Sequence, residues 1–264
     1  MNPVAVTSAL VVSGMHRSGT SLLASLVEGA GVSLGTRLIG PSRGNERGHF
    51  EDLDFYEIHA RSLEANGVPE HGFTLVGELT VPAGVRSAAA QLVAAKAAAG
   101  APWGWKDPRT CLFLDFWAEL LPESRFLFVV RSPWEVVDSL FRRGDETFAT
   151  HPLLAARVWL RYNRRIREFV VRHPTRCLLV AVEQVVAEPA RVFAAARRRL
   201  GFPLGEPPVR YEEGLLARRP ASSLKVILEA VLPEATELHV EMCRLAESSL
   251  GQIPTALPRS AAAA

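Results

Sequence analysis

The sequence predicts an α/β fold, a single domain of three layers in which helices flank a central parallel β-sheet. Short apolar runs at 9–12, 125–130 and 176–182 are typical of strands buried on both faces, as in a parallel sheet. Each run is followed by apolar residues at helical spacing, and this alternation of strand and helix is typical of crossover connections. We expect one domain over residues 1–264, with flexible ends at 1–8 and 255–264.

Composition excludes several classes of function. The 264 residues are 48% hydrophobic and 22% charged, as in ordinary globular proteins, and the formal net charge of +2 is too small to indicate nucleic-acid binding. The three cysteines are widely separated and form no C-x-x-C pair, which favours a reducing compartment over a zinc site or disulfides. No uncharged apolar run approaches the roughly 18 residues that span a bilayer. We expect a cytoplasmic protein with no nucleic-acid partner and no membrane span.

A glycine-bearing loop, Gly14–Gly19, joins the first predicted strand to a helix that begins at Thr20. Its glycines allow consecutive backbone N–H groups to point at one centre, an arrangement that binds anions. The spacing matches the nucleotide-binding phosphate loop, G-x-x-x-x-G-K-[ST], so the expected fold is P-loop-like. Thr20 and Ser21 occupy the K-[ST] positions, and the cation lies within the loop, at Arg17. The loop alone leaves open an ordinary turn between a strand and a helix.

A long polar segment, residues 31–54, follows the first helix. Loops of this length inside a compact domain are uncommon unless they are functional. The segment leads into a predicted helix over 54–66, for which Asp52 or Asp54 is a natural N-cap. Glu51 lies before this helix, and capping explains it least. The alanine-rich segment 85–99 is predicted to be a packing helix without a chemical role.

The sequence WGWKDPR at 103–109 contains two cations beside a proline. Pro108 fixes a turn and disfavours helical geometry for the preceding residue. We therefore expect Lys106 and Arg109 on a rigid loop, ahead of a helix over 110–121.

Arg131 follows the predicted strand 125–130 directly, and Ser139 lies about two turns into the next helix. Ligands of open α/β sheets bind beyond the carboxyl ends of the strands, where both Arg131 and the Gly14–Gly19 loop are expected. A nucleotide hydrolase usually has an acidic magnesium ligand at such a strand end. A cation at this position favours an anionic ligand bound by side chains.

In this order, the motifs HRSGTSLL, WKDPR and FLFVVRSPWEVVDSL resemble those of sulfotransferases that use 3′-phosphoadenosine-5′-phosphosulfate (PAPS). The similarity covers residues 9–142, and the spacing from Lys106 to Ser139 resembles that of the tyrosylprotein branch. Further along, Glu183 is the one residue that matches the family's tyrosine-glutamate-aspartate-leucine segment.

The resemblance implies transfer of a sulfuryl group from PAPS to a hydroxyl or amine, with adenosine 3′,5′-bisphosphate as the product. It implies that Arg131 and Ser139 bind the 3′-phosphate and that Lys106 faces the transferring group. Arg17 would also stabilise the departing charge, and no metal is required because cationic side chains replace magnesium. The residues implied on the 5′-phosphosulfate are Arg17, Ser18, Gly19, Thr20 and Ser21.

Sulfuryl transfer also needs a base for the proton of the acceptor. We assign this role to Glu51, with His49 as the alternative. The acceptor is expected to be a small molecule, a glycan or a lipid, with a peptide hydroxyl also open, and residues 35–50 are expected to shape its pocket. The sequence does not predict the oligomeric state.

Two other functions stay open. A phosphate-loop kinase or NTPase is disfavoured by Thr20 at the lysine position and by Arg131 at the strand end. A non-catalytic nucleotide-binding protein is compatible with the same motifs.

Overall fold

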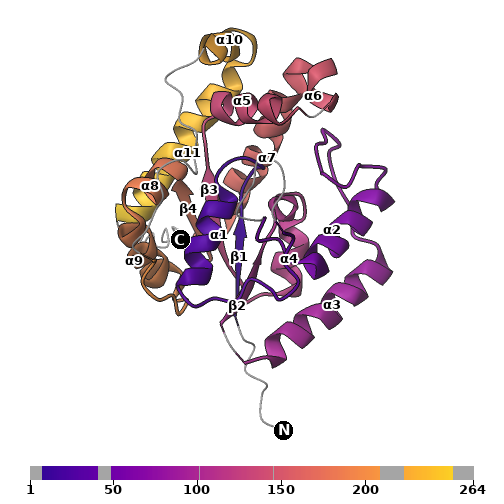
Figure 1. The fold of residues 1–264 in the computed structure, drawn as a ribbon, viewed down its shortest axis with the longest axis vertical. Helices are drawn as coiled ribbons and strands as arrows, with labels where there is room; N and C mark the ends of the chain where they lie inside the picture. Colours follow the sequence, from indigo (N-terminus) through magenta and orange to yellow (C-terminus); the bar gives the residue numbers. More distant parts are fainter. Residues whose placement is uncertain (1–7, 41–48, 101, 145, 209–222, 252–264) are drawn as a thin grey trace, which may run out of the picture.

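Four parallel strands form one sheet in the order β2-β1-β3-β4 (Figure 1). They are β1 (Ala9–Ser13), β2 (Trp103–Lys106), β3 (Arg125–Val130) and β4 (Cys177–Ala181). Because β1 lies between β2 and β3, the chain first runs from β1 to β2 at one edge of the sheet. It then returns to the other side of β1 to form β3 and β4. Such a reversal opens a crevice at the carboxyl ends of the central strands. The predicted fold class is confirmed.

The structure is a computed structural model that describes residues 8–40, 49–100, 102–144, 146–208 and 223–251. The predicted flexible ends, apart from Ser8, lie outside the described residues, as does the middle of the long segment over 31–54.

The strands form because almost every side chain in them is apolar and buried. In β1, Leu10 and Val12 belong to one hydrophobic cluster, whereas Ala9 and Val11 belong to another on the opposite face of the sheet. All four side chains have no exposed surface. Successive side chains of β1 point to opposite faces of the sheet, and both faces are buried, so the strand has no polar side.

Helices cover both faces of the sheet (Figure 1). The cluster around Leu10 and Val12 receives residues from α1 (Thr20–Gly29), α8 (Val182–Ala187) and α9 (Pro189–Leu200), and it also includes Leu250. The other cluster receives residues from α2 (Leu53–Ala65), α3 (Ala83–Ala98), α4 (Leu114–Leu120), α5 (Pro133–Arg143), α6 (Glu146–Thr150), α7 (Pro152–Arg172), α10 (Ser223–Val231) and α11 (Pro233–Gly251). Within the described ranges, no helix is both long and apolar enough to cross a membrane.

The prediction that Lys106 lies on a loop is wrong, because Trp103–Lys106 forms the edge strand β2. It pairs with β1 from Ala9 opposite Trp103 to Val12 opposite Lys106. A Cβ on Gly104 would collide with the Leu10 carbonyl oxygen, so this close pairing requires glycine. Lys106 therefore ends a strand, which fixes its position more firmly than a turn would.

The predicted helix over 110–121 is divided in two. Residues Pro108–Leu112 form a 3₁₀-helix, and α4 begins at Leu114. Asp107 caps the 3₁₀-helix by accepting a hydrogen bond from the Arg109 N–H at 2.8 Å. The short helices α6 and α10 were not predicted from the sequence.

Candidate active site

The loop between β1 and α1 crosses the carboxyl end of the sheet in a conformation that requires glycine. Gly19, the N-cap of α1, has a φ of 93°, and a Cβ on Gly14 would collide with the carbonyl oxygen of Val129 in β3. Glycine at the N-cap has no side chain to bind the first N–H groups of the helix. Arg17 has a φ of 67°, a strained value for a residue with a side chain.

Three of the predicted site residues are joined where β1 and β3 end. Arg17 Nε donates to Ser139 Oγ at 2.9 Å, and an Arg131 guanidinium nitrogen donates to the Arg17 carbonyl oxygen at 3.3 Å. Arg131 is buried and also forms an ion pair with Glu135 at 3.3 Å. Two guanidinium groups and a hydroxyl therefore lie together beside the glycine loop.

Lys106 is the centre of a second group of contacts. Its Nζ donates to Glu51 Oε1 at 2.8 Å, to the His49 carbonyl oxygen at 2.8 Å and to Ser21 Oγ at 3.3 Å. Lys106 is 2% exposed and Glu51 is 6% exposed. The lysine, the acid and a serine in the first turn of α1, separated by long stretches of sequence, thus converge on one buried point.

The two ends of the segment over 31–54 pair with each other and so place Glu51. Ile39 N–H donates to the Glu51 carbonyl oxygen at 2.8 Å, and His49 N–H donates to the Ile39 carbonyl oxygen at 3.1 Å. Phe50, between them, has a φ of 55°, which is unusual for a residue with a side chain. This local pairing points the Glu51 carboxylate at Lys106. Residues 41–48, expected to help shape an acceptor pocket, lie outside the described residues.

The two candidate bases, Glu51 and His49, lie in different electrostatic surroundings. Arg109 approaches the second oxygen of Glu51 at 3.7 Å, so the carboxylate lies between two cations. Burial lowers the pKa of the His49 imidazole, and the charge of Lys106 adds to this while Glu51 opposes it. At neutral pH His49 is therefore uncharged and able to accept a proton.

The remaining predicted residues lie as follows. Ser18 and Thr20 are buried in the loop and at the start of α1, and among the described residues Ser18 Oγ has no hydrogen-bond partner. Glu183 lies in the first turn of α8 with an exposed side chain.

A buried network that the sequence did not predict supports the end of β2. Trp117 Nε1 donates to His59 Nε2 at 2.9 Å, so the imidazole carries its proton on Nδ1 and donates to Asp107 Oδ2, also at 2.9 Å. Burial alone would raise the pKa of Asp107, but Arg109 and His59 outweigh it and hold that pKa well below its ordinary value. The sequence did hold a clue to this network, since His59 lies four residues after Phe55 and therefore on the same face of its helix.

His16, in the glycine loop, was also missed. Its ring lies edge-on to Phe73, with centroids 5.0 Å apart, and its Nε2 is buried without a partner among the described residues. Burial, with Arg109, lowers its pKa well below the ordinary value, so the ring is neutral.

The sequence model of the sulfotransferase family matches residues 9–206, three quarters of the chain. The chain belongs to this family. A Caenorhabditis elegans homologue of protein-tyrosine sulfotransferases is 22% identical over 111 residues, which span 41% of this chain and less than half, 43%, of that protein. The crystal structure of a sulfotransferase from Alicyclobacillus acidocaldarius superimposes with a TM-score of 0.54 at 14% identity, covering 90% of this chain and 96% of that one.

A sulfotransferase domain from the Synechococcus PCC 7002 olefin synthase matches with a TM-score of 0.47 at 21% identity, over 94% of this chain and 95% of that domain. At 14% identity, the likeness to the Alicyclobacillus acidocaldarius structure supports the fold alone.

Proposed function

We propose that this sulfotransferase transfers the sulfuryl group of PAPS to a hydroxyl or amine of an acceptor and releases adenosine 3′,5′-bisphosphate. The observation that carries the proposal is the convergence of Arg17, Lys106 and Arg131 on the glycine loop and the first turn of α1, at the ends of three adjacent strands. Each is buried or half-buried, and cations withdrawn from water bind anions more strongly than exposed ones do.

The chemistry of the donor set fits a ligand with two separated anionic groups. The open N-terminus of α1, Ser18 Oγ and Lys106 suit a phosphosulfate. Arg131 and Ser139, which are both hydrogen-bonded to Arg17, suit the 3′-phosphate. Bound PAPS supplies an activated sulfuryl group, whose bond to the phosphate oxygen breaks as the bond to the acceptor forms.

The residues of the chain have separate tasks in this scheme. Arg17 and Lys106 stabilise the negative charge that moves onto the phosphate, and the backbone N–H groups of Gly19 and Thr20 hold the group in place. Glu51 removes the acceptor proton. A neutral Glu51 no longer balances Lys106, so proton transfer leaves the full lysine charge directed at the reacting group.

His49 is the alternative base. Its lowered pKa keeps the imidazole neutral at pH 7, and its carbonyl oxygen holds Lys106 at 2.8 Å. Glu51 is preferred because its carboxylate contacts the lysine directly.

The acceptor is proposed to be a small molecule, a glycan or a lipid, and the C. elegans homologue adds a tyrosine hydroxyl to these classes. A cytoplasmic location is proposed from the cysteines, since Cys111, Cys177 and Cys243 are all free thiols. We propose no metal, because the cations named above take the place of magnesium.

A thermal-shift measurement tests the proposal. Adenosine 3′,5′-bisphosphate in a metal-free buffer should raise Tm, with a stabilisation of roughly 2.7 kcal/mol at 100 times its Kd. ATP with magnesium should do so far less, because Thr20 replaces the lysine that nucleotide hydrolases direct at the terminal phosphates. The reverse ranking would contradict the proposal and favour a kinase or NTPase.

A further inference from the structure

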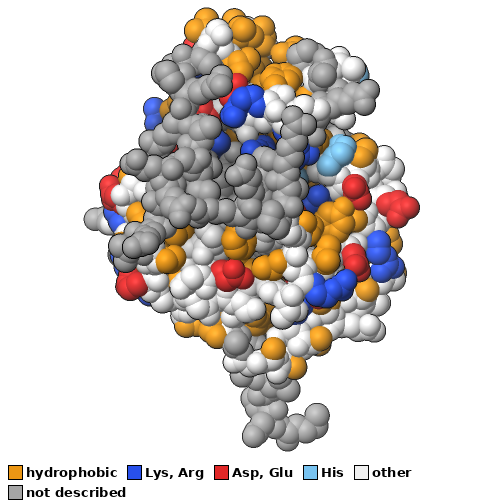
Figure 2. Space-filling view, in the orientation of Figure 1, with side chains coloured by type: hydrophobic (Ala, Val, Ile, Leu, Met, Phe, Trp, Pro, Cys, Tyr) orange, Lys and Arg blue, Asp and Glu red, His pale blue; other side chains and the backbone are white. Residues whose placement is uncertain are grey.

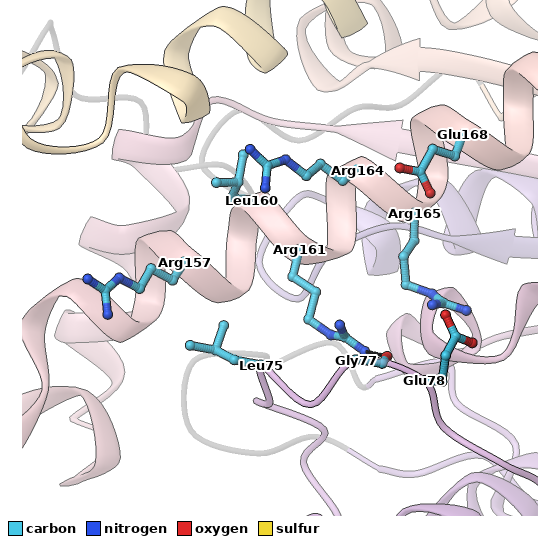
Figure 3. A pocket seen from close by; sticks show the side chains of 9 residues that line it. All are labelled: Leu75, Gly77, Glu78, Arg157, Leu160, Arg161, Arg164, Arg165 and Glu168. Carbon is cyan, nitrogen blue, oxygen red and sulfur yellow. Dashed lines mark hydrogen bonds between the residues drawn. The ribbon is translucent and has the colours of Figure 1, made fainter.

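A groove of about 430 Å³ lies along α7, on the side that faces the segment around Gly77 (Figure 3). Four arginines line it, at spacings of four, three and one residues, which place them along one side of the helix. They are Arg157, Arg161, Arg164 and Arg165, and the acidic residues of the lining are Glu78 and Glu168. In Figure 3, Arg161 and Arg165 extend from α7 toward the segment that carries Gly77 and Glu78.

The positive charge of this groove is not balanced within the described part of the chain. Four guanidinium groups face two carboxylates, and no carboxylate among the described residues lies within 4.0 Å of any of the four. Burial, and next the charge of Arg165, lowers the pKa of Arg161, so the cations disfavour one another. An anion placed among them would remove this repulsion.

Two of the arginines are fixed in position. Arg161 donates to the Gly77 carbonyl oxygen at 2.5 Å, and its buried Nε has no partner among the described residues. Arg165 Nε donates to the Cys111 carbonyl oxygen at 3.3 Å. Each of the two guanidinium groups is held by one hydrogen bond to a backbone carbonyl and keeps further N–H donors for a ligand. Arg157 and Arg164 are exposed and can close over it.

The groove uses none of the residues assigned to PAPS. Tyr162, which follows Arg161 in α7, is buried on another side of the helix, where it donates to the Gly72 carbonyl oxygen at 2.9 Å. Its ring lies 6.0 Å from that of His16 in the glycine loop. The buried side of α7 thus faces the glycine loop, whereas its arginine-lined side faces the groove.

We propose that this groove is a second anion site, which binds a ligand carrying two or more phosphate, sulfate or carboxylate groups. Its volume lies within the ~300–1,000 Å³ typical of small-molecule sites. Paired, planar guanidinium groups match the oxygens of such groups, and more than one anionic group is needed to engage arginines spread over two turns of helix.

Calorimetric titration with inorganic pyrophosphate, in a metal-free buffer, tests this site. The background is Arg17→Ala, which weakens binding at the glycine loop. Arg157→Gln/Arg164→Gln removes two exposed cations that have no ion pair among the described residues, and it should weaken pyrophosphate binding by about tenfold or more, the order expected for hydrogen bonds between charged groups. Glu78→Gln should strengthen binding. Arg172→Gln is the matched control, because this exposed arginine of α7 lies outside the groove.

Binding that is unchanged in Arg157→Gln/Arg164→Gln, or no binding at all in the Arg17→Ala background, would overturn the proposal. The readout does not depend on PAPS, so failure of the donor assignment leaves it intact. Inhibition kinetics on protein that retains Arg17 distinguish whether the natural anion is part of the acceptor or a separate ligand. Pyrophosphate that competes with the acceptor, and does so more weakly in the double variant, identifies the groove as the site for an anionic part of the acceptor. Inhibition that the acceptor does not relieve identifies a separate ligand.

Discussion

Lys106 and Glu51 form a buried ion pair, with Nζ 2.8 Å from Oε1, although they are 55 residues apart in sequence. The pair ties the edge strand β2 to the segment before α2. A buried ion pair is stable only while both partners are present, because either charge alone would be buried without compensation.

The pair predicts strong coupling between two substitutions. Lys106→Met should lower the free energy of unfolding by about 3–5 kcal/mol, because it leaves a buried carboxylate without its nearest cation. Adding Glu51→Gln to that variant should restore part of the loss. Urea denaturation of the wild type, both single variants and the double variant measures the coupling. Effects that simply add would show that the pair contributes nothing to stability.

The assignment of Glu51 as the base predicts the kinetics of Glu51→Gln. Turnover should fall by roughly 10²- to 10⁴-fold, because the amide keeps the shape of the side chain but cannot accept the proton of the acceptor. Affinity for adenosine 3′,5′-bisphosphate should change little, and His49→Ala should cost much less. Glu57→Gln on the exposed side of α2 is the control. A Glu51→Gln enzyme with most of its turnover would move the role to His49.

Arg131→Ala tests the binding of the 3′-phosphate. Loss of a charged contact with a dianion should weaken adenosine 3′,5′-bisphosphate by about 2–4 kcal/mol while 5′-AMP changes little. Titration calorimetry with both nucleotides measures the difference. Arg142→Ala, which removes an exposed arginine of the same helix region, should affect neither. Equal weakening of both nucleotides would mean that Arg131 supports the fold.

His239 in α11 predicts a loss of stability in acid. Burial holds its pKa at about 4 against an ordinary value of 6.5, with the charge of Lys225 adding to the effect and that of Glu135 opposing it. The unfolded chain therefore binds the proton first, and stability falls as the pH drops below about 6.5. Between pH 7 and pH 4 this group should remove about 3 kcal/mol. Urea denaturation of the wild type and of His239→Gln at both pH values measures this loss of stability. If the two proteins lose the same stability between pH 7 and pH 4, His239 is not the group responsible.

The parts of the site that the sequence predicted are those next to a strong local pattern. Arg131 follows a strand that is apolar from Phe126 to Val130, and Arg17 lies in a loop whose glycine spacing is characteristic. Strand β2 was missed because it is four residues long and contains a glycine, and only its pairing with β1 makes it a strand. The contact between Glu51 and Lys106 depends on how two distant segments meet, which no local pattern encodes.

The buried network around His59 was missed for a related reason. His59 lies on the buried face of its helix, but a histidine is polar and does not by itself indicate a buried position. Its partners Trp117 and Asp107 come from segments about fifty residues away. The Arg17–Ser139 hydrogen bond is a similar case, since each residue was predicted from its own motif while their contact was not.

The position of β1 within the sheet has a consequence for biosynthesis. This strand leaves the ribosome before the other three strands of the sheet, yet both of its neighbours, β2 and β3, lie about a hundred residues further on. At ordinary translation rates it waits on the order of ten seconds with both edges unpaired. An apolar strand in that condition readily joins the wrong partner. Chaperone demand in the cell should therefore be greatest while the segment between β1 and β3 is being synthesised.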